Sequence, residues 1–203
     1  LTAAVTGKLT EKWREEHPEV GEWKEIQSRG LFSFVTSGSR GWAKYYSEKG
    51  PLFLRIGNLD HNSIELDLTN KQFVTPPENA EGVRTKVQTN DILISITADV
   101  GMIALVPCNL GEAYINQHIS LARPNSIVNP FFLAWFLASP EGQTQFLSLQ
   151  KGATKVGLGL NDIKNVIVPL PPLDEQKEIV RQVDKLFALA DKVEEHYQKA
   201  RAR

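Results

Sequence analysis

Apolar residues in the middle of the chain, from about Val20 to Pro169, fall in short runs separated by Gly, Asn and Pro. Short runs that are apolar throughout, or that alternate with polar residues, are typical of β-strands, and the residues between them favour turns. The pattern therefore predicts a strand-rich globular region, with strands at residues 51–56, 91–97, 102–107, 113–115, 119–124 and 165–170.

One pair of helices is predicted within this region. Asn129 and Ser139 are both residue types that cap helix N-termini, and each is followed by a proline, which is favoured at the first helical position. We predict helices at residues 130–138 and 140–150, with Gly152 marking the end of the pair.

The N-terminal residues predict two short helical pieces. Residues 1–6 are typical of the last turns of a helix, with Gly7 as its left-handed C-cap. Thr10 is suited to cap a second helix that ends at Glu16, before Pro18.

The C-terminal stretch predicts a long helix with one apolar seam. Pro169, Pro171 and Pro172 favour an extended exit from the globular region, and Asp174 is a good N-cap. After that, apolar residues repeat at alternating intervals of four and three, as in a coiled coil. The seam consists of Ile179, Val183, Leu186, Ala190, Val193, Tyr197 and Ala200.

A helix of about 30 residues is about 45 Å long. Its length, its regular seam and the proline exit favour a projecting arm over a helix that lies on its own domain. We expect Val5 and Leu9 to cover Ile179 and Val183, and the rest of the seam to stay exposed. The seam therefore predicts a two-fold antiparallel dimer through residues 174–203.

Taken together, these elements predict an α+β fold: a mixed, strand-rich globular domain with a small helical pair, followed by a long projecting coiled-coil helix. The apolar run 130–138 is far shorter than the ~20 residues of a membrane span, and no secretory leader is visible. A single cysteine, Cys108, excludes an internal disulfide and a cysteine zinc site and suits the cytoplasm. Because the chain begins with Leu1, we expect it to be a piece of a longer protein.

Motifs for catalysis are weak. Asn129–Phe132 (NPFF) is similar to the Asn-Pro-Pro-aromatic motif of adenine methyltransferases, but it lacks the second proline, and a capped helix start explains it. Gly157 and Gly159 do not form a three-glycine phosphate loop. The four histidines show no metal-ligand spacing, and no nuclease motif stands out. We therefore expect neither catalytic residues nor a bound metal in this chain.

DNA contact is better supported, although the net charge is only −1. Between Ser37 and Asn58 the charged residues are four cations and only one acid, Glu48. In residues 36–50, Gly38 and Gly41 allow close approach to a backbone, while serines and cations can bind phosphates or base edges. The predicted DNA contacts here are Ser37, Ser39, Arg40, Lys44, Tyr45, Arg55 and Asn58. Tyr45, like Trp42 and Tyr46, is also suited to packing beneath the loop.

Two further stretches carry suitable residues. The glycine-bounded loop at residues 151–157 supplies Lys151, Thr154 and Lys155, which we also predict to contact DNA. Asn116 and Gln117 could pair with adenine, but they lie between two predicted strands, where amides often satisfy backbone groups. We favour the structural role for these two residues.

Four stretches resemble parts of one known family. PLPPLDEQKEIV (169–180), LTAAVTGKLTEKWREEHP (1–18), TNDILISITADVG (89–101) and KGATKVGLGLNDIKNVIVPLPPL (151–173) are together similar to the specificity subunit of type I restriction–modification enzymes. The resemblance covers nearly the whole chain, and the order and spacing of the stretches make it specific.

The resemblance implies an organisation and a function. Family subunits hold two recognition domains and two helices in tandem, and the helices pair antiparallel, so this chain resembles half a subunit. It implies the tail of a conserved helical region at 1–17, a target-recognition domain at 18–170 and a spacer and dimerisation helix at 171–203. The expected function is non-catalytic recognition of one half of a bipartite double-stranded DNA target.

The expected partners are methyltransferase subunits and, indirectly, restriction subunits, in which S-adenosylmethionine, ATP and magnesium would bind. A rival interpretation is a coiled-coil assembly module whose globular part binds protein instead of DNA. The near-neutral charge supports the rival, and the basic stretch 37–58 opposes it.

Overall fold

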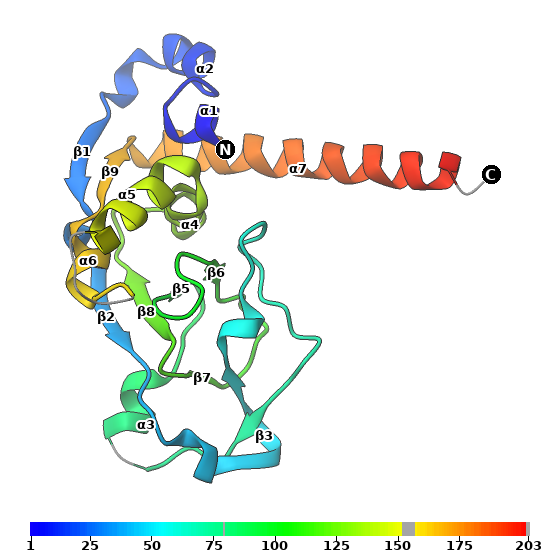
Figure 1. Cartoon of the computed structure of the whole chain (residues 1–203). Helices are drawn as coiled ribbons and strands as arrows, with labels where there is room; N and C mark the ends of the chain where they lie inside the picture. Colours follow the sequence, from blue (N-terminus) through cyan, green and yellow to red (C-terminus); the bar gives the residue numbers. More distant parts are fainter. Residues whose placement is uncertain (79, 152–156, 202–203) are drawn as a thin grey trace.

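The computed structural model describes residues 1–78, 80–151 and 157–201 of the chain. It has an elongated domain in three tiers, with helices at one end, a four-stranded sheet in the middle and a smaller sheet at the far end (Figure 1). A long helix, α7 (Leu173–Arg201), leaves the helical end and projects sideways from the domain. The fold is α+β, as the sequence predicts.

The central sheet is antiparallel, in the order β2-β8-β5-β6. Its strands are β2 (Phe32–Ser37), β8 (Ile119–Pro124), β5 (Ile92–Ser95) and β6 (Ile103–Leu105). Every residue of β5 and β6 is buried, because apolar clusters cover both faces of the sheet. This double burial explains why residues 92–94 of β5 and 103–105 of β6 are apolar in succession instead of alternating.

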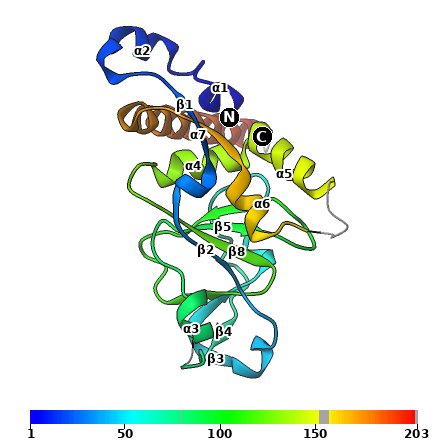
Figure 2. The same ribbon diagram turned by 90° about the vertical axis from the view of Figure 1, so that its left-hand side faces the viewer.

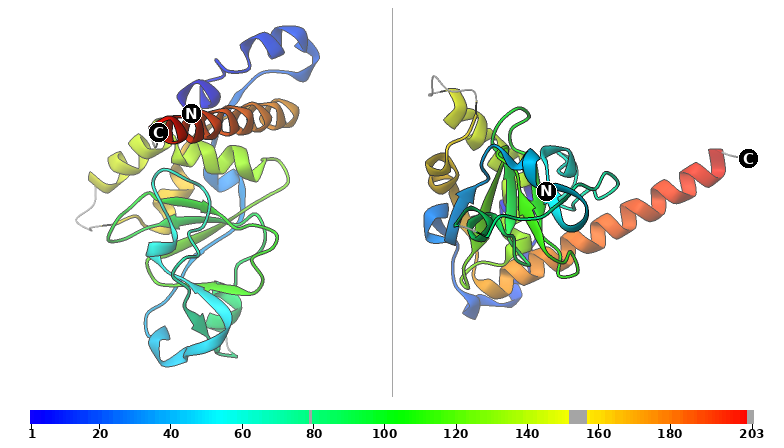
Figure 3. Two further views of the ribbon diagram at one scale, coloured as in Figure 1. Left: turned by 90° about the vertical axis from the view of Figure 1, so that its right-hand side faces the viewer. Right: turned by 90° about the horizontal axis from the view of Figure 1, so that it is seen from below.

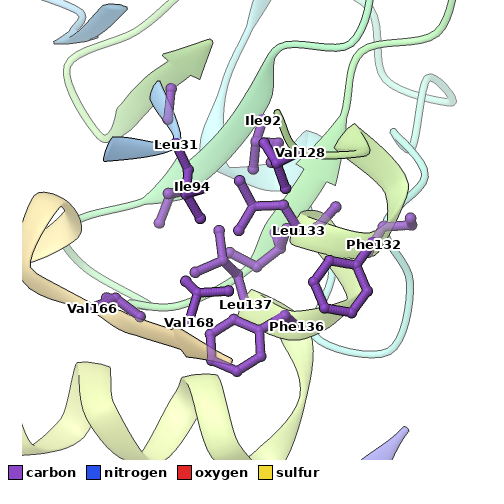
Figure 4. Close-up of a cluster of buried hydrophobic side chains, with 14 of the residues drawn as sticks. Leu31, Ile92, Ile94, Val128, Phe132, Leu133, Phe136, Leu137, Val166 and Val168 are labelled. Atoms are coloured by element: carbon purple, nitrogen blue, oxygen red, sulfur yellow. The ribbon is translucent and has the colours of Figure 1, made fainter. Parts of the chain in front are cut away.

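Two helices cover one face of this sheet. They are α4 (Pro130–Ala138) and α5 (Pro140–Lys151), the predicted helical pair. Figure 4 shows Phe132, Leu133 and Phe136 of α4 in the core they share with Ile92 and Ile94 of β5. The caps are also confirmed: Asn129 Oδ1 accepts from the amide of Phe131 at 2.9 Å, and Ser139 Oγ accepts from the amide of Gly142 at 3.3 Å.

The small sheet lies at the end of the domain away from α7 (Figures 1 and 2). In it, β3 (Tyr46–Leu54) pairs antiparallel with β4 (Phe73–Val74) and parallel with β7 (Ala113–Ile115). Beside it lies the short helix α3 (Ala80–Thr85). A mainly aromatic cluster lies at this end and is formed by Trp42, Phe53, Tyr114 and Val74, with Tyr45 packed against it.

A two-stranded ribbon brings the two ends of the domain's chain together. In it, β1 (Lys24–Gln27) pairs antiparallel with β9 (Ile167–Leu170), so that Lys24 lies opposite Leu170. The short helix α6 (Leu160–Asn165) leads into β9. The ribbon places α1 (Thr2–Val5) and α2 (Glu11–Glu16) beside the start of α7, as Figure 2 shows.

Only the first turns of α7 touch the domain. Ile179 and Val183 are 1% and 3% exposed and belong to the main core, and Phe187 stacks on Trp135 at a centroid distance of 4.9 Å. From Leu186 onward every described residue of the helix is exposed. At 29 residues the helix is about 44 Å long, and its outer half stands clear of the domain (Figure 3).

The sequence predictions of local structure are largely confirmed, with two errors. All six predicted strands overlap strands β3, β5, β6, β7, β8 and β9. However, α7 begins at Leu173, so Asp174 lies in its first turn instead of capping it. Thr10 precedes α2 but makes no capping hydrogen bond; its hydroxyl donates to Glu175 at 2.7 Å. The boundaries 1–17, 18–170 and 171–203 stay a prediction.

Candidate nucleic-acid interface

The predicted DNA-binding loop lies at the end of the domain opposite α7. It connects β2 to β3 and includes a 3-10 turn at Trp42–Tyr45 (Figure 1). Gly41 has φ of +87°, a left-handed conformation that suits glycine, and no atom lies near the position a Cβ would take. The space around Gly41 would admit a side chain, but any other residue would be strained at this φ. The turn therefore depends on glycine for its backbone conformation.

Arg84 of α3 holds the start of this loop. Its guanidinium donates to the Thr36 hydroxyl and the Ser37 carbonyl, and to the Ser39 hydroxyl at 2.8 Å. It also forms an ion pair with Glu81 at 2.5 Å. One arginine thus donates to four acceptor groups, and these bonds fix the start of the loop before any ligand binds.

Glu81 completes this network. Trp42 Nε1 donates to Glu81 Oε1 at 3.2 Å and thereby ties the 3-10 turn to α3. Burial alone raises the pKa of Glu81, but hydrogen bonds from Arg84, Ser39 and Trp42 outweigh burial and hold the pKa below its usual value. The carboxylate is therefore the stable form, and it anchors the loop.

Arg40 and Lys44 are the exposed cations of the loop. Within the described part of the chain neither has a carboxylate partner; Lys44 Nζ lies 4.9 Å from the ring centroid of Tyr45. Tyr45 is half-buried and packs edge-on against Trp42. Trp42 is 3% exposed and stacks on Phe53, with the two ring centroids 4.9 Å apart. Tyr45 thus packs both against Lys44 and against the buried Trp42.

Ser37 and Ser39, whose DNA contacts stay a prediction, also have partners within the chain. The Ser39 hydroxyl and the Ser37 carbonyl are already hydrogen-bonded to Arg84. Gly38 lies close to a backbone, as its residue type suggests, but that backbone belongs to this chain. A Cβ on Gly38 would lie 2.1 Å from the Asn116 carbonyl oxygen. These residues therefore build the loop from within.

The assignment of Asn58 to DNA contact is wrong. Asn58 is 4% exposed, its Oδ1 accepts from the Arg55 amide at 2.8 Å, and its Nδ2 donates to the Asp67 carbonyl at 2.7 Å. A buried amide with both ends hydrogen-bonded inside the chain has no group left for a base. Arg55, at the end of β3, is half-buried, and its DNA contact stays a prediction.

The second predicted loop is only partly described. Lys151 is the last residue of α5, and Thr154 and Lys155 lie outside the described residues. The structural role favoured for Asn116 is confirmed, since it is 7% exposed and its Oδ1 accepts from the His118 amide at 3.0 Å.

Sequence reasoning missed a hollow beside the loop. It has a volume of about 910 Å³ and is lined by residues that include Phe34, Val83, Arg84, Lys86 and Arg123. Its cations are paired: Lys86 with Glu112 at 3.2 Å, and Arg123 with the fully buried Asp91 at 2.7 Å. The hydrogen bonds from Arg123 to Asp91 raise the pKa of Arg123. Within the residues described, Lys86 and Arg123 therefore each have a carboxylate partner, unlike Arg40 and Lys44 of the loop.

The seam of α7 divides into two parts. Ile179 and Val183 are buried in their own domain's core, so their assignment to a surface that pairs with another copy does not agree with the structure. The outer positions Leu186, Val193 and Tyr197 are 54%, 61% and 57% exposed, and Ala190 and Ala200 are also exposed. Five of the seven seam residues are therefore accessible.

Two structural features bear on other functions. Among residues 1–78, 80–151 and 157–201, no group of three or more His, Cys, Asp or Glu side chains is arranged to hold a metal ion. In the same ranges, no helix is both long and apolar enough to cross a membrane.

Comparison with known proteins identifies the family. The chain is 35% identical over 216 residues to the EcoBI type I restriction enzyme specificity subunit of Escherichia coli, covering 100% of this chain and 45% of that protein. It is 52% identical over 220 residues to the EcoDI specificity subunit of Escherichia coli, covering 100% and 48%. The chain therefore spans about half the length of these relatives.

Solved structures share the fold. The HsdS subunit from Thermoanaerobacter tengcongensis superposes with a TM-score of 0.64 at 17% identity, over 96% of this chain and 50% of that one. The family model for the type I restriction modification DNA specificity domain matches residues 57–200, which include most of the domain and nearly all of α7. The chain therefore belongs to the family of type I restriction–modification DNA specificity domains.

Proposed function

We propose that this chain recognises one half of a split double-stranded DNA target and does so without catalysing a reaction itself. The observation that carries the proposal is the match of residues 57–200 to a DNA specificity domain. The geometry supports it, because the domain presents unpaired cations at one end and a projecting helix at the other. The chain spans about half of its relatives, which suits one half of a target.

In this proposal the loop at residues 38–45 contacts DNA. Arg40 and Lys44 are exposed, and each can reach a phosphate or a guanine edge. Arg84 and Glu81 hold the loop from behind, so that little conformational entropy is lost on binding. Arg55 and the residues Lys151, Thr154 and Lys155 would add further contacts to DNA.

The outer half of α7 would pair antiparallel with the same half of a second helix. In the isolated chain that helix belongs to a second copy, and a two-fold axis makes the contact self-complementary. The two domains would then lie apart by roughly the arm length, about 45 Å. Because one DNA turn is about 34 Å, the two half-sites would be separated by unread base pairs.

We further propose that the complete assembly supplies the chemistry. Methyltransferase subunits would bind S-adenosylmethionine, and restriction subunits, joined indirectly, would bind ATP and magnesium. The site of action would be the cytoplasm. Incubation of the purified chain with labelled S-adenosylmethionine, ATP, magnesium and duplex DNA should transfer no label and cut no DNA; label in the DNA above a no-protein control would contradict the proposal.

A second candidate is an assembly module whose globular part binds protein. The net charge of −1 favours it, since DNA-binding domains are commonly basic. A salt titration of binding to random duplex DNA separates the two. Phosphate contacts predict that log K falls linearly with log salt, by about 0.9 for each phosphate contacted. Absence of binding to any duplex at low salt would favour the assembly module.

A further inference from the structure

Glu175, in the first turn of α7, is a fully buried carboxylate with three donors from a distant part of the chain. Its Oε1 accepts from the Thr10 hydroxyl at 2.7 Å and from Arg14 Nε at 3.0 Å. Its Oε2 accepts from Trp23 Nε1 at 2.8 Å. The side chain of Glu175 has no exposed surface, so its charge is satisfied by these donors alone among the described residues.

Arg14 extends the network to the N-terminal segment. Its Nη2 donates to the Gly7 carbonyl at 2.5 Å, and its guanidinium lies over the Trp23 ring, 5.6 Å from the centroid. Gly7 has φ of +80°, and a Cβ there would lie 2.9 Å from Arg14 Nη2. The segment from residue 7 to residue 23 is thus folded around one carboxylate of the arm.

The next residue holds the arm from another side. Gln176 is 1% exposed, and its Oε1 accepts from the Asn129 amide at 2.6 Å, just before α4. Its Nε2 donates to the Pro171 carbonyl at 2.8 Å. Two successive side chains therefore join α7 to two different elements, the N-terminal segment and α4, and both its tilt and its rotation are constrained.

A small change at this junction is amplified along the helix. From Glu175 to Arg201 the helix extends about 39 Å, so a rotation of about 10° at the base moves the tip by about 7 Å. Base pairs are stacked about 3.4 Å apart, so the displacement corresponds to about two base pairs. A buried charge with all its partners in place resists such rotation, because any opening leaves an uncompensated carboxylate.

We propose that Glu175 is the positioning residue that fixes the direction of the α7 arm relative to residues 1–23. As a consequence, which rests on the proposed function, it sets the number of unread base pairs between two half-sites. Glu175 does not touch DNA in this proposal. It acts through the direction of the helix that carries the second domain.

The first test measures the arm direction in the isolated chain. With Cys108 replaced by Ser, spin labels at Glu15 on α2 and Lys192 on the arm report their separation by pulsed electron resonance. Labelled chain is diluted with unlabelled chain so that only distances within one chain contribute. The starting protein should give one narrow distance distribution. Glu175→Gln keeps the size of the side chain and should shift or broaden the distribution, and Glu175→Ala should broaden it further.

Two controls separate arm direction from general stability. Asp174→Asn removes the exposed ion pair with Lys177 in the same helical turn, and Ile103→Val weakens the core in β6 without touching the junction. Both should keep the narrow distribution. If either Glu175 variant is fully folded by circular dichroism and keeps the narrow distribution, the proposal is overturned. If Ile103→Val broadens it equally, the effect is general and the proposal is also overturned.

The second test maps methylation by the complete enzyme carrying Glu175→Gln. The expected result is modification of targets whose unread gap is longer or shorter by one base pair, with both half-site sequences unchanged. If Glu175→Gln broadens the distance distribution but the enzyme still methylates only targets with the original gap, Glu175 does not set the number of unread base pairs. If the unaltered enzyme reads no split target, the proposed function fails, whereas the distance measurement still judges the role of Glu175 in the arm.

Discussion

The two halves of α7 share one apolar seam but differ in whether the chain itself buries that seam. At the base, Ile179 and Val183 are buried in the domain core, and Glu175 and Gln176 have their hydrogen bonds made within the chain. In the outer half, Leu186, Val193 and Tyr197 continue the same spacing but remain more than half exposed. The base therefore belongs to the fold, whereas the outer half presents its apolar residues to solvent.

The same contrast recurs at the other end of the domain. Arg84 has all its hydrogen bonds inside the chain and shapes the loop, whereas Arg40 is exposed and has no carboxylate partner in the described ranges. Groups that are satisfied internally build this molecule, and groups that are left unsatisfied are available for binding. Substitutions of matched residues from the two classes can break this distinction.

The largest effect is expected at Glu175. Glu175→Ala leaves Thr10 and Trp23 without an acceptor and Arg14 without its counter-ion, so we expect a loss of about 3 kcal/mol in the free energy of unfolding. Asp174→Ala, one residue earlier and exposed, should change it by less than about 0.5 kcal/mol. Urea denaturation at one fixed chain concentration measures both. Equal losses would mean that burial does not distinguish the two carboxylates.

Two valines of the seam provide a matched pair. Val183→Ala should lower the free energy of unfolding by about 2 kcal/mol, since it removes buried methyl groups and leaves a cavity. Val193→Ala should weaken self-association, but it should leave the unfolding free energy unchanged in a chain made monomeric by Leu186→Asp. Leu186→Asp should abolish self-association, because it would bury a charge in each copy.

Sedimentation equilibrium and urea denaturation together measure these effects. A chain that stays monomeric at tens of micromolar before any substitution would show that the outer seam does not pair with a second copy. Lower unfolding stability of Val193→Ala in the Leu186→Asp background would show that the outer half packs within its own chain.

Arg84 of α3 and Arg40 of the loop should differ in their contribution to the free energy of unfolding. Arg84→Ala removes hydrogen bonds to Ser37 and Ser39 and should cost about 1–2 kcal/mol of unfolding free energy, since a half-exposed network is weaker than a buried one. Arg40→Ala should leave stability unchanged. Thermal unfolding checks both; a destabilising Arg40→Ala would mean that this side chain has a structural partner.

The smallest expected effect is a pH dependence at Glu81. Because hydrogen bonds hold its pKa in the folded state below that of an ordinary Glu, about 4.3, folding favours the charged form. Its stabilising contribution should be complete above about pH 5 and disappear as the pH falls through the folded pKa. The difference in unfolding free energy between the starting protein and Glu81→Gln should therefore shrink below about pH 4. A constant difference down to pH 3 would contradict the assignment.

The sequence predicted the elements that depend on local pattern. Continuous apolar runs predicted strands such as β5, and the four-three spacing predicted a projecting α7. Strand β1 was missed because Ile26 is its only apolar residue, and its pairing with β9 is set by tertiary contacts.

Contacts between distant residues were beyond the sequence. The partners Arg14 and Glu175 are separated by 161 positions, and no pattern links Arg84 to the loop at residues 38–45. Asn58 was misassigned because a polar residue at a strand end is equally suited to bind a base or to close a turn. Its burial decides between the two, and burial of a single amide cannot be inferred from residue type.

The most direct test of DNA recognition by the loop compares two double variants in one salt titration. Arg40→Ala with Lys44→Ala removes both exposed loop cations, and Lys12→Ala with Lys24→Ala removes two exposed cations near α7. If both loop cations contact phosphates, the first pair should make the slope of log K against log salt less negative by about 2. The second pair should leave the slope unchanged. An unchanged slope in the loop variant, or an equal change in both variants, would contradict the proposal that the loop at residues 38–45 contacts DNA.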